Sequence, residues 1–157
     1  ITSATRPDPR TESAHQDGLV TTMLRFGNGL LALSLEDVWS GPRAEGYPDD
    51  QHIRWRVEGT EGVARGTIGW PTGEPSTLSY ASRAAKGHTD GRWITPTWDT
   101  MWFPHAFIGV MEQLQYALAS DTEPALSVTD NVRTMALVEA AYTSIAEGRT
   151  VRLPAVE

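Results

Sequence analysis

LVTTMLRFGNGLLALSLEDVW, residues 19–39, is the stretch that decides the fold. Two runs rich in β-forming residues flank Gly27-Asn28-Gly29. An Asn-Gly pair supplies the positive φ angles that a two-residue hairpin turn requires. With Asn28 and Gly29 as the turn residues, Gly27 pairs with Leu30. The stretch therefore predicts an antiparallel hairpin.

This register sorts the side chains of the hairpin onto two faces, because side chains alternate along a strand with period two. One face is apolar and is expected to be covered, whereas the other carries Arg25, Ser34 and Glu36. A slip of one residue would destroy this sorting. The predicted apolar pairs are Phe26 with Leu31, Leu24 with Leu33 and Thr22 with Leu35; the predicted mixed pairs are Arg25 with Ala32, Met23 with Ser34 and Thr21 with Glu36.

A second hairpin follows, with strands over residues 53–58 and 63–70 and a turn at Gly59-Thr60-Glu61-Gly62. The register of this turn sets Trp55 opposite Gly66, so that the indole fills the gap left by glycine. It also sets Arg56 opposite Arg65, which is an unfavourable pair of like charges. Shorter strands are predicted over residues 1–4, 77–81, 92–97 and 150–153, with loops between them.

The last third of the chain has helical periodicity. Apolar residues from Phe103 to Leu118 fall on one stripe, and Pro104 suits a first helical turn. A second helix is predicted to begin at Ser127, where Ser-Val-Thr-Asp is a capping-box pattern, and to end at Gly148. Tyr142 belongs to the apolar stripe of this second helix.

Strands that precede helices, rather than alternate with them, indicate an α+β fold. We expect one domain over residues 1–157, built on a large, mostly antiparallel, open-faced sheet with the helices packed on one face. The opposite face is then left for solvent, a ligand or a second subunit. The residues predicted for that face, and for an interface between subunits, are Arg25, Ser34, Glu36, Arg54 and Arg56.

Composition excludes several functions. The formal charge of −7 disfavours nucleic acid as a partner, and the chain has no cysteine for disulfides or thiolate metal sites. The chain has no apolar run of about 18 residues, so no membrane span is predicted. No leader is visible either, so we expect a cytoplasmic protein. The four histidines lack paired ligand spacing, so no metal site is predicted.

Three segments resemble a known family: IRWRVEGTEG (53–62), PHAFIGVMEQL (104–114) and SVTDNVRTMALVEAAYTS (127–144), the last closed by EGRTV (147–151). Together with the FGNG turn (26–29), they resemble the C-terminal half of the glucose–fructose oxidoreductase/inositol dehydrogenase (Gfo/Idh/MocA) family. The resemblance covers most of the chain, and the final helix with its flanks is its most specific part.

The resemblance implies a Rossmann domain paired with an α+β domain, whose sheet forms subunit interfaces and lines the substrate pocket. The implied reaction is hydride transfer between a sugar, polyol or related alcohol and NAD or NADP. No Gly-x-Gly-x-x-Gly follows a strand here, and Lys86 is not the lysine of the family's Glu-Lys-Pro motif. The family's catalytic Asp and His would precede Ile1. We therefore expect no catalytic, cofactor-binding or metal-binding residue in this chain, with NAD or NADP held by a missing N-terminal Rossmann domain.

Four residues are candidates for contact with the sugar-type substrate. Tyr47 resembles a substrate-touching tyrosine of some family members, although its spacing to the next strand is longer, and His52 lies near it. His105 opens a helix beside two aromatic residues, and Trp39 ends the facing strand. Structural alternatives are an exposed or tryptophan-packed histidine for His105 and core packing for Trp39.

Three functions fit these observations. The leading one is the substrate-binding and homo-oligomerising part of an NAD(P)-dependent dehydrogenase, which alone would not be an enzyme. The second is a non-enzymatic binding or assembly module that lacks the cofactor domain. The third is a small sugar-binding domain lined by some of the six tryptophans. For Arg54 and Arg56, binding of an anionic substrate is the alternative to the favoured interface role.

Overall fold

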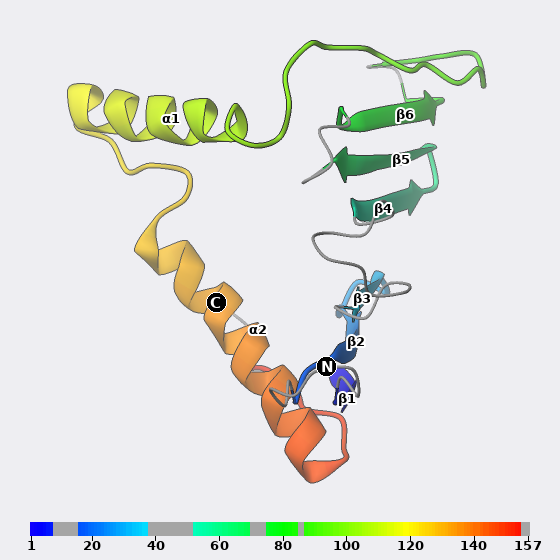
Figure 1. Cartoon of the computed structure of the whole chain (residues 1–157), viewed down its shortest axis with the longest axis vertical. Helices are drawn as coiled ribbons and strands as arrows, with labels where there is room; N and C mark the ends of the chain where they lie inside the picture. The colour runs from blue at the N-terminus through cyan, green and yellow to red at the C-terminus, as the bar shows by residue number, and fades with distance from the viewer. Residues whose placement is uncertain (8–15, 38–51, 70–74, 85–86, 155–157) are drawn as a thin grey trace, which may run out of the picture. The chain divides into compact units, whose positions relative to one another are not determined.

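The computed structural model describes residues 1–7, 16–37, 52–69, 75–84 and 87–154. Its element order is six strands followed by two helices (Figure 1). The chain divides into two compact units, one made of Ile1–Ser40 with Glu123–Glu157 and the other of Gly41–Thr122. Each unit holds a three-stranded antiparallel sheet, so the predicted α+β class and antiparallel pairing are confirmed.

The first unit contains β1 (Thr2–Arg6), β2 (Leu19–Arg25) and β3 (Leu31–Asp37), in the order β1-β2-β3. The hairpin between β2 and β3 forms, but its turn has three residues rather than two. Phe26 N–H donates to Leu30 O at 3.0 Å, and Gly29, at φ +87°, donates to Phe26 O at 3.1 Å. One left-handed residue after the turn is typical of three-residue hairpin loops.

The predicted register of this hairpin is therefore wrong by one residue. Arg25 pairs with Leu31, and Met23 pairs with Leu33. Because one step moves every side chain of a strand to the other face, the sorting changes completely. Met23, Arg25, Leu31, Leu33 and Leu35 share one face, which we call the leucine face. Ser34 and Glu36 lie on the opposite face, so Arg25 does not share a face with them as predicted.

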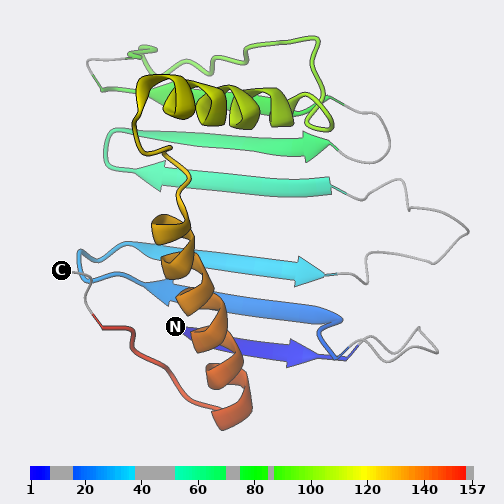
Figure 2. The same ribbon diagram turned by 90° about the vertical axis from the view of Figure 1, so that its left-hand side faces the viewer.

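The second face of this sheet is covered by α2 (Val128–Glu147), which crosses β1–β3 in Figure 2. Ser127 caps the helix by accepting from Asp130 N–H at 3.2 Å, and Gly148 ends it in a left-handed conformation at φ 63°. Both predicted helix ends are confirmed. A side-chain cap of this kind stabilises a helix by about 1 kcal/mol.

Small side chains let α2 approach β1 closely. Ala140 and Ser144 are buried, and the Ser144 hydroxyl accepts from Ser3 N–H at 2.9 Å while donating to Arg149 O at 2.8 Å. At the sheet edge, Ile1 and Val151 exchange hydrogen bonds of 2.7 and 2.9 Å. The strand predicted over residues 150–153 is thus reduced to this one pairing, while β1 forms close to its predicted place.

The second unit contains β4 (His52–Gly59), β5 (Gly62–Gly69) and β6 (Thr77–Ser82), in the order β4-β5-β6. Trp55 pairs with Gly66 and Arg56 with Arg65, so the predicted register of this hairpin is confirmed. The strand predicted over residues 92–97 is present only as a bridge between Ile94 and Tyr80.

Helix α1 (Ala106–Ser120) also belongs to the second unit and follows a cis peptide bond between Phe103 and Pro104. Ala117 is the only residue of α1 that is buried, and the predicted apolar stripe, including Phe107 and Met111, is exposed. Of the two helices, α2 thus covers a sheet face as predicted, whereas α1 keeps its stripe uncovered. Neither helix is long and apolar enough to cross a membrane, in the part of the chain that is described.

Candidate functional site

The four residues predicted to contact substrate are only partly within the described structure. Trp39 and Tyr47 lie outside the described residues. His52 begins β4 and pairs with Gly69, but its side chain is not among those described. His105 is exposed, and its Nδ1 lies 3.1 Å from Met101 N and 3.2 Å from Met101 O, within a local turn. A shared substrate pocket for these four residues stays a prediction.

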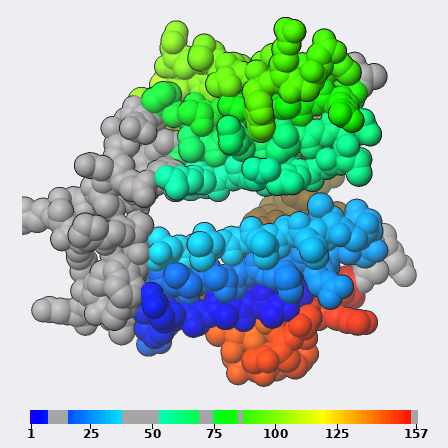
Figure 3. Space-filling model, turned by 90° about the vertical axis from the view of Figure 1, so that its right-hand side faces the viewer, coloured from blue at the N-terminus to red at the C-terminus, as the bar shows by residue number. Residues whose placement is uncertain are grey.

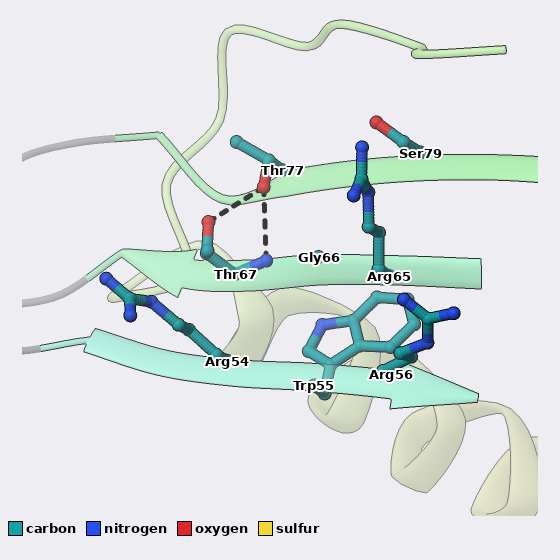
Figure 4. Close-up of a pocket in the computed structure, with 8 residues that line it drawn as sticks. All are labelled: Arg54, Trp55, Arg56, Arg65, Gly66, Thr67, Thr77 and Ser79. Carbon is teal, nitrogen blue, oxygen red and sulfur yellow. Dashed lines mark hydrogen bonds between the residues drawn. The ribbon is translucent and has the colours of Figure 1, made fainter. Parts of the chain in front are cut away.

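A shallow hollow of about 450 Å³ lies on the sheet of the second unit (Figure 4). We call it the arginine hollow. Alternation along β4 puts Arg54 and Arg56 on one side, and the register sets Arg65 opposite Arg56. Neighbouring β6 contributes hydroxyl groups. The lining residues are Arg54, Trp55, Arg56, Arg65, Gly66, Thr67, Thr77 and Ser79.

Two of these guanidinium groups are held by neighbours on the same sheet face. Arg56 Nε forms an exposed ion pair with Glu58, two residues further along β4. The Arg65 guanidinium carbon lies 4.6 Å from the ring centroid of Trp93, as in a cation–π contact. The interface role predicted for Arg54 and Arg56 stays a prediction, and within the chain Glu58 pairs with Arg56 along one strand.

The hydroxyl groups at the hollow form short local contacts. Thr67 Oγ1 and Thr77 Oγ1 lie 2.8 Å apart, and Thr67 N–H donates to Thr77 Oγ1 at 3.1 Å, as Figure 4 shows. Ser79 Oγ lies 2.9 Å from Thr95 Oγ1. These bonds tie β6 to its neighbours on both sides.

Gly66 lets the Trp55 indole lie close against β5. A Cβ added at Gly66 would lie 2.7 Å from Trp55 Cζ2, and still closer to the carbonyl oxygen of Thr77. Any side chain at this position would therefore collide with an atom that cannot rotate away. The hollow has cationic and hydroxyl donors, and no histidine or carboxylate is among its lining residues. It is equipped to bind an anion rather than to transfer a proton.

A second hollow, of about 310 Å³, lies between α2 and the sheet of the first unit. At its mouth, Tyr142 Oη donates to Asp17 Oδ2 at 3.1 Å, and Thr5 Oγ1 donates to Asp17 Oδ1 at 3.3 Å. The hydrogen bond to Asp17, followed by the negative charge of that carboxylate, raises the pKa of Tyr142 above its ordinary value. Ser34 and Glu36, predicted for an interface, line this hollow instead of the leucine face.

The contact between Tyr142 and Asp17 had no signal in the sequence. Asp17 lies in a segment next to a predicted loop, and Tyr142 was predicted only as part of an apolar helical stripe. The two residues are 125 positions apart, so only the docking of α2 brings them together.

The leucine face is the third candidate surface. Leu31, Leu33 and Leu35 are 61, 82 and 68% exposed, and Arg25 lies beside them. Figure 3 views this side of the sheet, where β1–β3 lie in front of α2. Contiguous exposed apolar side chains of this kind typically mark a surface that contacts another protein.

The described residues do not fit a dinucleotide cofactor. Such a cofactor needs a glycine-rich turn that leads from a strand into a helix N-terminus. Here α1 follows Phe103-Pro104-His105, and the N-terminus of α2 is already capped by Ser127. Within the same residues, no group of three or more His, Cys, Asp or Glu could hold a metal ion.

Among curated proteins, a D-apiose dehydrogenase from Rhizobium rhizogenes is similar in sequence to this chain. The two sequences are 32% identical over an alignment of 146 residues, and this alignment covers 89% of this chain. The same alignment covers 39% of the dehydrogenase, so the chain spans well under half the length of this relative. No protein-family model matches the chain, and no solved structure matches it. The chain thus has a distant relative among sugar dehydrogenases.

Proposed function

We propose that this chain is the substrate-binding and subunit-binding part of an NAD(P)-dependent dehydrogenase that oxidises a sugar, polyol or related alcohol. The similarity to a D-apiose dehydrogenase carries this proposal. The relative is much longer than the aligned region, which leaves room for a cofactor-binding Rossmann domain elsewhere in the parent protein.

The catalytic part of the proposal is tested on the full-length protein encoded by the gene that contains this sequence. With D-apiose as the first substrate, we expect NAD or NADP to be reduced, which is followed by the absorbance of the reduced nicotinamide. The 157-residue chain alone should give no reduction. A full-length protein that binds neither NAD nor NADP would overturn the proposal and favour the non-enzymatic binding or assembly module.

For the subunit-binding part, the leucine face is the surface that we propose for a homo-oligomer. In a symmetric dimer, the same surface patch of each subunit contacts its copy on the other. The leucine face would then place three leucines of one subunit against the same three of its partner, which gives an apolar, self-complementary contact. Arg25 stays in this proposed interface. Ser34 and Glu36 do not, because they lie on the face toward α2.

Leu33→Asp tests this interface, because it places a charge at the centre of the leucine face. We expect the variant to be monomeric by sedimentation velocity under conditions in which the unmodified protein is an oligomer. Val128→Asp is the matched control, since Val128 on α2 is 83% exposed and Leu33 is 82% exposed. An oligomer that survives Leu33→Asp, or that is lost equally in both variants, would contradict the assignment.

A further inference from the structure

We propose that the arginine hollow on β4–β5–β6 binds a small oxyanion, namely the phosphate or carboxylate group of a small solute. This inference goes beyond the proposed dehydrogenase function and does not depend on it. Positive charges face one another in this hollow. Arg56 lies directly opposite Arg65, and Arg54 is on the same side of β4. Like charges placed opposite each other destabilise a sheet; the Glu58 ion pair offsets this at Arg56, and a bound anion would offset it further.

Two guanidinium groups in the hollow are held in place but keep N–H donors available for a ligand. The cation–π contact uses the flat face of the Arg65 guanidinium, whose N–H donors lie in the plane of the group. The Glu58 ion pair is made through Nε of Arg56, which is one of five N–H donors on that side chain. Both neighbours therefore restrict the arginines while leaving donors directed along the guanidinium planes.

The charges around the hollow favour a small anion over a polyanion. The lining residues of the hollow include no carboxylate, although the chain as a whole carries a formal charge of −7. A polyanion such as nucleic acid would be repelled by the acidic chain, whereas a single small anion meets mainly the three arginines of the hollow, of which Arg56 is paired with Glu58. The hydroxyls of Thr77 and Ser79 add neutral donors beside the arginines. Planar guanidinium groups of this kind match the geometry of carboxylate and phosphate oxygens.

The test is a titration of the 157-residue chain with inorganic phosphate at low ionic strength. Trp55 lines the hollow and Trp93 lies against Arg65, so tryptophan fluorescence should report binding, with calorimetry as the second readout. We expect saturable binding to one site, weakened by added sodium chloride. Malonate provides the carboxylate arm. Displacement of phosphate by malonate would support a general oxyanion site, and phosphate binding without displacement would support a phosphate-specific one.

Arg65→Gln should weaken phosphate binding at least about tenfold, because it removes charge-assisted hydrogen bonds. Arg133→Gln is the matched control, with the same loss of charge at an exposed position of α2 in the other unit, and should leave the dissociation constant within about twofold. Trp93→Leu should weaken binding about two- to fivefold, because it removes the stacking partner of Arg65 and keeps every arginine.

If circular dichroism shows that Arg65→Gln does not fold, phosphate binding is measured on Arg56→Gln instead, with the same expected weakening. An absence of saturable binding, or equal weakening by Arg65→Gln and Arg133→Gln, would overturn the proposal. So would a change of oligomeric state in Arg65→Gln without any change in phosphate affinity, because the arginines would then serve carboxylates of a second copy.

Discussion

The two sheets of this protein are alike in size and pairing, yet their faces are built in different ways. In the first unit, α2 covers one face of β1–β3 through buried hydroxyl contacts, and the other face presents exposed leucines. In the second unit, β4–β6 is held by the complementarity of Trp55 and Gly66, and one face collects arginines. Exposure of an apolar face to water is unfavourable, so such a face favours a protein partner, whereas an arginine-lined face favours an anion.

Unfolding of the two units can be followed with two different spectroscopic signals. Five of the six tryptophans fall within the second unit, so tryptophan fluorescence mainly follows that unit, whereas far-ultraviolet circular dichroism follows both helices, α2 of the first unit and α1 of the second. Variants of the two sheets should therefore shift the two signals to different extents. If both probes shift together for every variant, the two units unfold as one.

The largest effect is expected for Gly66→Ala in the second sheet. The added Cβ would collide with the Thr77 carbonyl oxygen and the Trp55 indole, and overpacking of this kind typically costs about 1–3 kcal/mol. We expect the upper end of that range, measured by urea unfolding with tryptophan fluorescence. Gly109→Ala, in α1 with nothing within 4 Å of the new Cβ, should be neutral or slightly stabilising. An unchanged urea midpoint for Gly66→Ala would contradict the close approach.

Ser144→Ala should have the next largest effect, and it acts on the first sheet. It leaves the Ser3 N–H and the Arg149 carbonyl without their present partner, at a cost of about 1–2 kcal/mol. Thermal unfolding followed by circular dichroism measures this loss. Thr143→Ala is the neighbouring control, because the Thr143 hydroxyl only donates back to Glu139 O within the same helix. Equal loss in both variants would argue against a special role for the α2–β1 contact.

Ser127→Ala should cost about 1 kcal/mol, because it removes the side chain that accepts from Asp130 N–H at the start of α2. Ser127→Asp should restore stability, since an aspartate caps a helix as well as a serine does. Circular dichroism melting curves of both variants test this. A melting temperature that the alanine leaves unchanged would show that docking on the sheet, and not the cap, decides the stability of α2.

The smallest effect is expected for Tyr142→Phe, and it depends on pH. The hydrogen bond to Asp17 raises the pKa of Tyr142 in the folded protein above its ordinary value of 10.0. A raised pKa contributes stability that is present below the ordinary value and is lost as the pH rises through the folded-state value. The melting temperature of the unmodified protein should thus fall more steeply above about pH 10 than that of Tyr142→Phe. Identical pH profiles would refute the contact.

The confirmed predictions concern segments in which local chemistry allows one conformation. Gly59 and Gly62 flank a two-residue turn and pair with each other, which fixes the register of Trp55 against Gly66. Ser127 and Gly148 likewise mark the ends of α2, because a capping hydroxyl and a left-handed glycine are local requirements. These features depend on neighbours within a few positions.

The two-residue turn predicted at Gly27-Asn28-Gly29 was wrong, because two glycines permit either a two-residue or a three-residue turn. Only Gly29 of this pair has a positive φ, and the resulting register moves the leucines away from α2. Alternation of apolar and polar residues could not reveal this, because the two residues of α2 that are buried, Ala140 and Ser144, have small side chains.

The sequence by itself determined the α+β class, the two hairpins, the ends of α2 and the opposition of Arg56 and Arg65. Local turn chemistry, capping and period-two alternation suffice for these, since each acts over a few residues. Only the tertiary structure decided which face of β1–β3 is exposed, and that Trp93 lies against Arg65 and Tyr142 against Asp17. These contacts join residues that are distant in the chain, so their geometry depends on how whole elements pack.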